Sequence, residues 1–346
     1  MLKTLRRFLS TTTTMKAIVY DGFGGPEVIK VREFPIPKFD PSTECLIKVE
    51  TTALNRAEIM QRKGKYPPPK GVTDIPGLEC AGYILNSPSE LKSGAYKTNR
   101  RVMAMLQGGG YSTIVKARFG EIMDIPKGFS FEQAASIPEA WITAYQLINW
   151  LGDMKRGENV LVHAGASGVG TSAIQLIKSA GGFGIAVCSN KNKIDACINL
   201  GAKYGINYKE VKEFSKTVLE YSNNHGADVI LDPVFGSHYQ ENLKSLANEG
   251  RWVIYAFMGG AKTPDMNAPK LFSKKASLIF TTIRMRTREY RDKLVKEFAD
   301  KVLPKFERGE LKPIIDTIIP MSQITEAQKR MERNENIGKI VIRMDI

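Results

Sequence analysis

The feature that most constrains the fold is a glycine-rich turn between a short apolar run and an amphipathic pattern. Residues 158–182 read ENVLVHAGASGVGTSAIQLIKSAGG. The β-rich run from Val160 to Val162 predicts a buried strand. The apolar residues after the turn fall mostly on one helical face, and Gly181 and Gly182 supply a stop signal. The order strand, turn, helix is the unit from which parallel sheets are built.

The turn is suited to the pyrophosphate of a dinucleotide, because a helix N-terminus presents free N–H groups and a partial positive charge. Against the fingerprint G-x-G-x-x-G, Gly165 and Gly170 match the outer positions, Ser167 replaces the middle glycine, and Gly168 is an extra glycine. No Gly-Lys-Ser/Thr follows, which excludes a Walker loop. We expect Ser167, Gly168, Val169 and Gly170 to bind the cofactor; a purely structural strand-to-helix turn is the alternative.

The end of the following strand indicates which dinucleotide is bound. Residues 184–190, GIAVCSN, predict that strand, and NAD-selective sites place a carboxylate about 20 residues beyond the turn. Here the position holds Asn190, followed by Lys191 and Lys193, and these groups accept a 2′-phosphate that a carboxylate would repel. Tyr208 can add a hydroxyl or an aromatic face at the adenine end. We predict NADPH; ordinary surface charge is the alternative for the lysines.

Length and composition exclude several classes of protein. The 346 residues suffice for two domains, and a hydrophobic content of 42% is that of a globular chain with a core. No apolar run approaches the roughly 18 residues that span a bilayer. The four cysteines, Cys45, Cys80, Cys188 and Cys197, form no C-x-x-C pair, so neither a disulfide scaffold nor a cysteine zinc site is indicated.

The N-terminal segment carries a targeting signal. Residues 1–16, MLKTLRRFLSTTTTMK, are basic and rich in Ser and Thr, and no acidic residue precedes Asp21. This composition is typical of a mitochondrial transit peptide. We expect residues 1–14 to direct the protein to the mitochondrial matrix and the folded part to begin at Met15. A disordered tail on a cytoplasmic protein is the alternative.

Three further segments are expected after this leader. Residues 15–137 contain short strands broken by Gly and Pro, which predict a β-barrel-like substrate domain. Residues 138–280 alternate strands and helices, which predicts a parallel sheet covered on both faces. Residues 281–346 contain helices and a final strand, and we expect them to pack back on the first domain.

The chain is basic, with a net charge of +14. A dense group of lysines and arginines lies between Lys274 and Lys293. Such a patch can contact nucleic acid, an acidic partner or a membrane surface, but most basic runs are solvated faces. Part of the excess charge also suits an anionic cofactor. We therefore do not expect specific nucleic-acid binding and keep it as an alternative.

Six stretches together resemble a known family: ALNRAEIMQRKGKYPPP at 53–69, IPGLECAGYI at 75–84, IPEAWITAYQLI at 137–148, HAGASGVGTSAIQL at 163–176, GRWVIYAFMGG at 250–260 and NIGKIVI at 336–342. From Met15 onward the chain is similar to the zinc-free NADPH:quinone oxidoreductase branch of the medium-chain dehydrogenase/reductase superfamily, which includes zeta-crystallin. The resemblance implies an α/β fold, with a GroES-like β-barrel domain before a Rossmann domain and the active site in the cleft between them.

The departures from zinc-dependent relatives concern the metal. Zinc alcohol dehydrogenases of this superfamily have Cys where this chain has Asn55 and His where it has Leu78, and neither replacement is a competent zinc ligand. Residues 86–101 also lack the cysteines of the structural zinc site. The resemblance therefore implies hydride transfer without a metal.

Metal-free hydride transfer needs an electrophilic acceptor, such as a quinone or an enone, and a modest proton donor. Asn55 and Tyr66 lie in the segment that faces the cofactor in relatives, and we expect them to be catalytic. For Asn55 the alternative is a helix cap, since Glu58 three residues later completes a capping box. For Tyr66 it is aromatic packing in the proline-rich loop.

The resemblance also assigns cofactor contacts. Thr143 would lie near the nicotinamide ribose or phosphate, and Phe257 and Met258 would line the nicotinamide pocket. Lys339 would close the cleft from the C-terminal segment, with a solvated strand-end lysine as the alternative. Lys193 and Tyr208 match positions that relatives use around the 2′-phosphate.

The expected function is NADPH-dependent reduction of quinones or similar conjugated carbonyls, by one or two electrons. A mitochondrial trans-2-enoyl thioester reductase is the alternative enzyme, and a non-catalytic RNA-binding or assembly-subunit role is the alternative outside catalysis. We expect a homodimer, because the apolar strand SLIFTT at 277–282 would lie at the edge of the Rossmann sheet and could pair with its copy.

Overall fold

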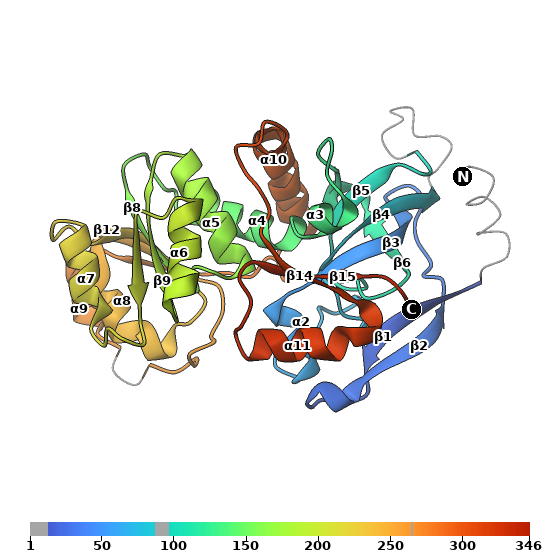
Figure 1. The fold of residues 1–346 in the computed structure, drawn as a ribbon, viewed down its shortest axis with the longest axis horizontal. Coiled ribbons are helices and arrows are strands. Elements are labelled where there is room, and N and C mark those ends of the chain that lie inside the picture. The colour runs from blue at the N-terminus through green and yellow to red at the C-terminus, as the bar shows by residue number, and fades with distance from the viewer. Residues whose placement is uncertain (1–12, 87–96, 264–265) are drawn as a thin grey trace. The chain divides into compact units, whose positions relative to one another are not determined.

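The computed structural model describes residues 13–86, 97–263 and 266–346. The described residues form two compact units (Figure 1), one from those up to Glu139 together with Arg284–Ile346 and one from those between Ala140 and Ile283. The predicted targeting segment falls almost wholly on residues 1–12, outside the described residues. Among the helices that the structure describes, none has the length and apolar character needed to cross a membrane.

The first unit is built on a mostly antiparallel sheet that includes the last strand of the chain, with β14 and β15 as its one parallel pair among the described strands. β15 pairs antiparallel with β3, with Ile340 opposite Leu54, so a strand from the last part of the chain lies in the same sheet as the strands of residues 44–124. The strand order is β14-β15-β3-β4-β5-β7, and β6 also pairs with β3. The bounds are β3 (Glu44–Leu54), β4 (Glu79–Asn86), β5 (Arg101–Met105), β6 (Ile114–Arg118), β7 (Ile122–Asp124), β14 (Ile315–Pro320) and β15 (Lys339–Arg343), with a separate hairpin of β1 (Thr14–Tyr20) and β2 (Ile29–Pro35).

Three short helices and one long one flank this sheet in the described part of the chain, and the ends of several follow from local sequence. Ser130 caps α3 and forms a capping box with Gln133, and Thr287 caps the long helix α10. The helices are α2 (Arg56–Arg62), α3 (Phe131–Ala135), α10 (Arg288–Glu307) and α11 (Ile324–Glu332), with 3-10 turns η1 (Pro26–Val28), η2 (Phe119–Glu121) and η5 (Met321–Gln323). Helix α4 (Pro138–Tyr145) begins in this unit and continues into the second.

The second unit is a six-stranded, fully parallel sheet in the order β10-β9-β8-β11-β12-β13. Its strands are β8 (Asn159–His163), β9 (Phe183–Cys188), β10 (Tyr204–Asn207), β11 (Ala227–Asp232), β12 (Leu246–Ile254) and β13 (Ser277–Phe280). Its helices are α5 (Gly168–Ser179), α6 (Lys191–Leu200), α7 (Phe214–Tyr221), α8 (Tyr239–Ser245) and α9 (Ala268–Ser273), with η3 (Gln146–Leu151) and η4 (Gly236–His238). From β8 the next strands along the chain, β9 and β10, add to one side of the sheet, whereas β11, β12 and β13 add to the other side. In such sheets ligands bind at the carboxyl ends of the strands where this change of side occurs, here β8 and β11.

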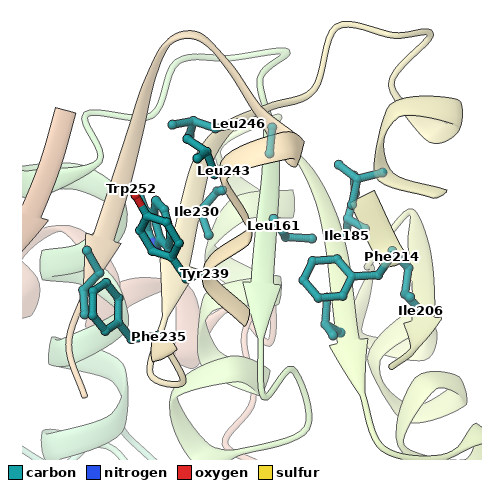
Figure 2. Close-up of a cluster of buried hydrophobic side chains, with 14 residues drawn as sticks. Leu161, Ile185, Ile206, Phe214, Ile230, Phe235, Tyr239, Leu243, Leu246 and Trp252 are labelled. Carbon is teal, nitrogen blue, oxygen red and sulfur yellow. The ribbon is translucent and has the colours of Figure 1, made fainter. Parts of the chain in front are cut away.

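The core of the second unit follows from the period of two in its strands. Inward-facing residues of neighbouring strands pack against α7 and α8 (Figure 2), and all are at most 4% exposed. The strand residues include Leu161, Ile185, Ile206, Ile230 and Trp252, and the helices contribute Phe214 from α7 and Tyr239 and Leu243 from α8. Burial of each large side chain contributes about 1.5–3 kcal/mol. The core therefore fixes the strand ends at which the predicted site residues lie.

The basic segment from Lys274 to Lys293 is not one continuous exposed surface. Arg284 and Arg291 are each only 4% exposed. Arg291 forms a buried ion pair with Glu121, 2.8 Å apart, and Arg284 donates from Nε to the carbonyl oxygen of Gln107 at 2.7 Å. The expectation of a solvated basic face is therefore wrong for these two arginines, which are structural.

Candidate functional site

The glycine-rich turn joins β8 to α5, as the sequence predicts. Ser167 is the N-cap of α5, and its Oγ accepts a hydrogen bond from the Gly170 N–H at 3.0 Å. Where the fingerprint has glycine, serine thus provides a side-chain acceptor for an amide of the first turn. Ser167, Gly168 and Val169 are partly exposed, whereas Gly170 is buried.

Gly170 is required by the packing of the turn. A Cβ at this position would lie 2.4 Å from the carbonyl oxygens of both Ala164 and Gly165. The helix can therefore approach the strand only if this residue is glycine, which is the role of the third glycine in dinucleotide-binding turns. The amides of Gly168 and Val169 precede the hydrogen-bond ladder of the helix and are placed to bind an anion.

The adenosine end of the predicted site lies where β9 ends. Asn190 caps α6, and its Oδ1 accepts from the Lys193 N–H at 3.0 Å. The Tyr208 N–H donates to the Cys188 carbonyl oxygen at 3.1 Å, which places Tyr208 beside the same strand end. No carboxylate occurs from Cys188 to Lys193. The structure thus places Asn190 and Lys193 at one helix N-terminus, while Tyr208 follows the neighbouring strand β10 and its ring lies 5.5 Å from the ring of His238.

A buried polar network at the ends of β8 and β11 was not anticipated from the sequence. Asp232 accepts hydrogen bonds from Asn242 Nδ2 and Trp252 Nε1, both at 2.9 Å, and from the backbone N–H groups of Val234 and Phe235. Asn242 Oδ1 lies 2.6 Å from Nε2 of the fully buried His163. Because that oxygen only accepts, Nε2 carries the proton. The network fixes the strand ends at the switch point.

His238 extends this network. Its Nδ1 lies 3.3 Å from Nδ1 of His163, so His238 donates to the remaining acceptor of that ring. Burial and the neighbouring His163 lower the pKa of His238 to about 4, and burial also lowers the pKa of His163. Both rings are therefore neutral at physiological pH. The sequence contains three histidines far apart from one another, so the contact between His163 and His238 could not be predicted from it.

The loop after β12 presents the residues predicted to line the nicotinamide pocket. Phe257 and Met258 are 48% and 47% exposed. The Met258 N–H donates to the Pro233 carbonyl oxygen at 2.9 Å, and the Phe257 ring contacts the Phe235 ring edge to face at 5.6 Å. Backbone hydrogen bonds thus hold the loops after β11 and β12 together, with two large apolar side chains left at the surface of this unit.

The first unit contains a buried charged cluster around Asn55. Lys339 Nζ lies 2.7 Å from Glu79 Oε1, and the two residues are 4% and 0% exposed. The ammonium also donates to Asn55 Oδ1 and to the Leu54 carbonyl oxygen, while Asn55 Nδ2 donates to Glu79 Oε1 at 2.9 Å. The alternative that Lys339 is a solvated strand-end lysine is therefore wrong.

Asn55 also begins α2, and the predicted capping box is present. Glu58 Oε2 accepts from the Asn55 N–H at 2.7 Å, and Glu58 Oε1 accepts from the Leu78 N–H at 3.1 Å. Burial raises the pKa of Glu58 to about 7. The capping role of Asn55 is therefore confirmed, and its side-chain amide also links Lys339 to Glu79.

Tyr66 lies half-buried against an arginine. The guanidinium of Arg284 is 5.4 Å from the centre of the Tyr66 ring, within the range of a cation–π contact. A pair of hydrogen bonds between Arg284 and Gln107, each 2.7 Å, fixes the arginine. The Tyr66 ring is therefore positioned by a buried cation.

The described residues hold no group of three or more His, Cys, Asp or Glu side chains that could bind a metal ion. Leu78 is buried, with 2% of its surface exposed, and lies directly before Glu79. The polar groups at Asn55 are its own amide, the carboxyl groups of Glu58 and Glu79, and the ammonium of Lys339.

Comparison with known proteins agrees with this architecture. Residues 41–144 match the family model "Alcohol dehydrogenase GroES-like domain", and residues 168–300 match "Zinc-binding dehydrogenase". The Danio rerio "Synaptic vesicle membrane protein VAT-1 homolog" is 27% identical over 96% of this chain and 70% of its own length. The Homo sapiens "Quinone oxidoreductase" is 27% identical over 95% of this chain and 97% of its own.

Among solved structures, a Pseudomonas syringae pv. Tomato DC3000 quinone oxidoreductase superposes with a TM-score of 0.84 at 25% identity, covering 95% of this chain and 99% of that one. The two family models together match most of the sequence, in the order of the two predicted domains. The chain therefore belongs to the medium-chain dehydrogenase/reductase superfamily and is an oxidoreductase of that type.

Proposed function

We propose that the protein is an NADPH-dependent, metal-free reductase of quinones or similar electrophilic conjugated carbonyls. The observation that carries the proposal is the carboxylate-free end of β9, where Asn190 caps α6 and Lys193 lies in its first turn. A 2′-phosphate fits this helix N-terminus by charge, whereas the second hydroxyl of NADH finds no carboxylate there.

The residues of the second unit fit the rest of the cofactor. The amides of Gly168 and Val169, with Gly170 allowing close packing, would bind the pyrophosphate beside Ser167. Thr143 would contact the nicotinamide ribose, and Tyr208 the adenosine end. Phe257 and Met258 would line the nicotinamide pocket. When bound, the cofactor supplies the hydride, and the protein supplies orientation and polar groups.

The first unit would supply the catalytic residues Asn55 and Tyr66. Tyr66, fixed by Arg284, would donate its phenol hydrogen bond to the carbonyl oxygen of the acceptor. Asn55 would act together with Lys339, because Asn55 Oδ1 accepts a hydrogen bond from the Lys339 ammonium. This contact would fix the positions of the polar groups next to the acceptor. Lys339, held by Asn55, would also contribute to binding the cofactor. Zinc independence rests on Asn55 and Leu78, which are not zinc ligands.

Turnover of an ortho-quinone and of a trans-2-enoyl thioester, each with NADPH, tests the proposal. Quinone turnover is the expected result, and detection of a semiquinone radical by electron spin resonance would assign one-electron transfer. Turnover of thioesters alone would contradict the substrate class and favour the enoyl reductase. Tight NADPH binding with neither activity would point to a non-catalytic role.

We also propose a homodimer formed through β13, the last strand of the parallel sheet. Phe280 at its end is 51% exposed, and an edge strand offers backbone groups to a second copy. Sedimentation of wild type and of Phe280→Lys tests this: a dimer that the substitution dissociates is expected, and a wild-type monomer would contradict it.

For localisation we propose the mitochondrial matrix, on the basic, acid-free composition of residues 1–14. Fusion of these residues to a fluorescent protein tests the proposal. Import into mitochondria is expected, and a diffuse signal would contradict it.

A further inference from the structure

Helix α4 has one open face. Of its eight residues, Pro138–Tyr145, only Glu139 and Thr143 are not buried. They are four residues apart and therefore lie one above the other on the same side of the helix. If Thr143 contacts the nicotinamide ribose as proposed, the side chain next to it on that face would lie near the reacting end of the cofactor.

The charged cluster of the first unit holds Glu139 in position. The Glu139 backbone N–H donates to Glu79 Oε2 at 2.8 Å, while Glu79 Oε1 accepts from Lys339 and Asn55. The helix therefore begins on a buried carboxylate that is itself fixed by an ion pair. Within the described part of the chain, the Glu139 carboxyl group makes no ion pair or side-chain hydrogen bond, so its oxygens remain available for a ligand.

The surroundings of Glu139 favour the protonated acid. Partial removal of the Glu139 carboxyl group from water, together with the neighbouring carboxylates Glu79 on β4 and Glu58 on α2, raises the pKa of Glu139 to about 8. Lys339 on β15 and Arg284 before α10 act in the opposite direction but do not outweigh these effects. The three hydrogens of the Lys339 ammonium already have acceptors in Leu54, Asn55 and Glu79. At neutral pH the group therefore carries a transferable proton.

We propose that Glu139 is a further catalytic residue, the acid that donates a proton to the carbonyl oxygen of the acceptor as hydride arrives; this inference rests on the proposed reductase function. The acceptor gains the hydride and its electron pair from the reduced nicotinamide, and the negative charge develops on oxygen. The O–H bond of Glu139 breaks and a new O–H bond forms on that oxygen. The Glu139 carboxylate then regains a proton from water, and Tyr66 stabilises the same oxygen by hydrogen bonding.

The kinetic test compares wild type with Glu139→Gln, which keeps the shape of the protonated acid but has no acidic proton. We expect kcat with an ortho-quinone to fall by about 10²-fold, the smaller effect typical of a lost general acid. In wild type the rate should decline as pH rises through about 8, and this decline should be absent in the variant. Glu139→Asp should restore part of the rate and the pH dependence.

Glu326→Gln is the matched control. Glu326 also lies in the first turn of a helix, α11, but is exposed and pairs with Lys329 at 2.8 Å. Its rate and pH profile should equal those of wild type. NADPH binding measured by fluorescence should be the same in all variants, which separates loss of proton transfer from loss of the cofactor site.

Infrared spectroscopy tests the protonation state without turnover. Wild type should show, besides the C=O band of Glu58 that disappears with a midpoint at pH about 7, a second carboxylic-acid band with a midpoint at pH about 8, and Glu139→Gln should lack this second band. Absence of the second band in wild type, or full activity of Glu139→Gln, would overturn the role of Glu139 while leaving the reductase function intact. Absence of wild-type quinone turnover with the second band present would instead overturn the proposed function and, with it, the catalytic role of Glu139.

Discussion

Lys339 and Glu79 form an ion pair with 2.7 Å between Nζ and Oε1, and neither side chain is more than 5% exposed. The two residues are 260 positions apart in sequence, on β15 and β4. The pair joins the C-terminal strand to the N-terminal sheet and holds both Asn55 and the start of α4.

Removal of one partner of this pair should destabilise the protein strongly. Lys339→Met leaves the buried Glu79 carboxylate without its cation, and the free energy of unfolding should fall by about 3–5 kcal/mol. Urea denaturation measures the change. Adding Glu79→Gln to Lys339→Met should recover part of the loss, because no buried charge then lacks a partner.

The control is an exposed pair. Lys275 lies 3.1 Å from Glu249, with both side chains more than 70% exposed, so Lys275→Met should cost no more than about 1 kcal/mol. An equal effect of Lys275→Met and Lys339→Met would contradict the structural role of the buried pair.

Substitutions of Ser167 should separate helix capping from phosphate binding. Ser167→Ala should reduce the free energy of unfolding by about 1 kcal/mol, because the Gly170 N–H loses its acceptor. Ser167→Asp keeps a cap and should leave stability within about 0.5 kcal/mol of wild type. Its carboxylate should nevertheless weaken NADPH binding by repelling the pyrophosphate, whereas the neutral cap Ser167→Asn should not. Equal NADPH affinities for the Asp and Asn variants would place the pyrophosphate elsewhere.

Gly170→Ala should disrupt the turn. The new Cβ would lie 2.4 Å from two backbone oxygens, so the helix must move away from β8. We expect a loss of more than about 1 kcal/mol in unfolding free energy and at least about tenfold weaker NADPH binding.

Gly184→Ala is the matched control for this substitution. Gly184 lies in β9 of the same sheet, and the nearest atom to its added Cβ is 3.8 Å away. Gly184→Ala should therefore change neither the free energy of unfolding nor the affinity for NADPH. Normal NADPH binding by Gly170→Ala would show that the turn does not approach the cofactor.

The His163 and His238 pair should make stability depend on pH. Because the pKa of His238 is lowered to about 4, below its unfolded value of about 6.5, the unfolded state binds more protons between these values. The contribution of His238 to the free energy of unfolding should therefore have its full value above pH about 6.5 and decrease as the pH falls towards about 4. His238→Asn should reduce this slope, and the same substitution at the exposed His225 supplies the control. An unchanged slope in His238→Asn would contradict the buried, neutral pair.

The fold could be predicted because its signals are local. The run from Val160 to Val162, the glycines of the turn and the alternation of strands and helices identified β8, α5 and the parallel sheet. The capping box of Asn55 and Glu58 was also visible, since its residues are three apart.

Most of the contacts that fix the site could not be predicted. Lys339 meets Glu79, and Arg284 meets Gln107 and Tyr66, only after the sheet has brought distant segments together. The local sequence pattern around a residue does not indicate which distant residue it will contact. The cap formed by Ser167 is the exception, because Ser167 and Gly170 are three residues apart, which is the spacing of an N-cap contact.

The most direct test of the proposed NADPH site is the affinity for NADPH and NADH of wild type and of Lys193→Glu, with Lys216→Glu on α7 as the control. Wild type and the control should prefer NADPH, and Lys193→Glu should weaken NADPH binding by about ten- to hundredfold while leaving NADH nearly unchanged. A wild type that binds both cofactors equally, or a Lys193→Glu variant with unchanged preference, would contradict the assignment of the 2′-phosphate to the N-terminus of α6.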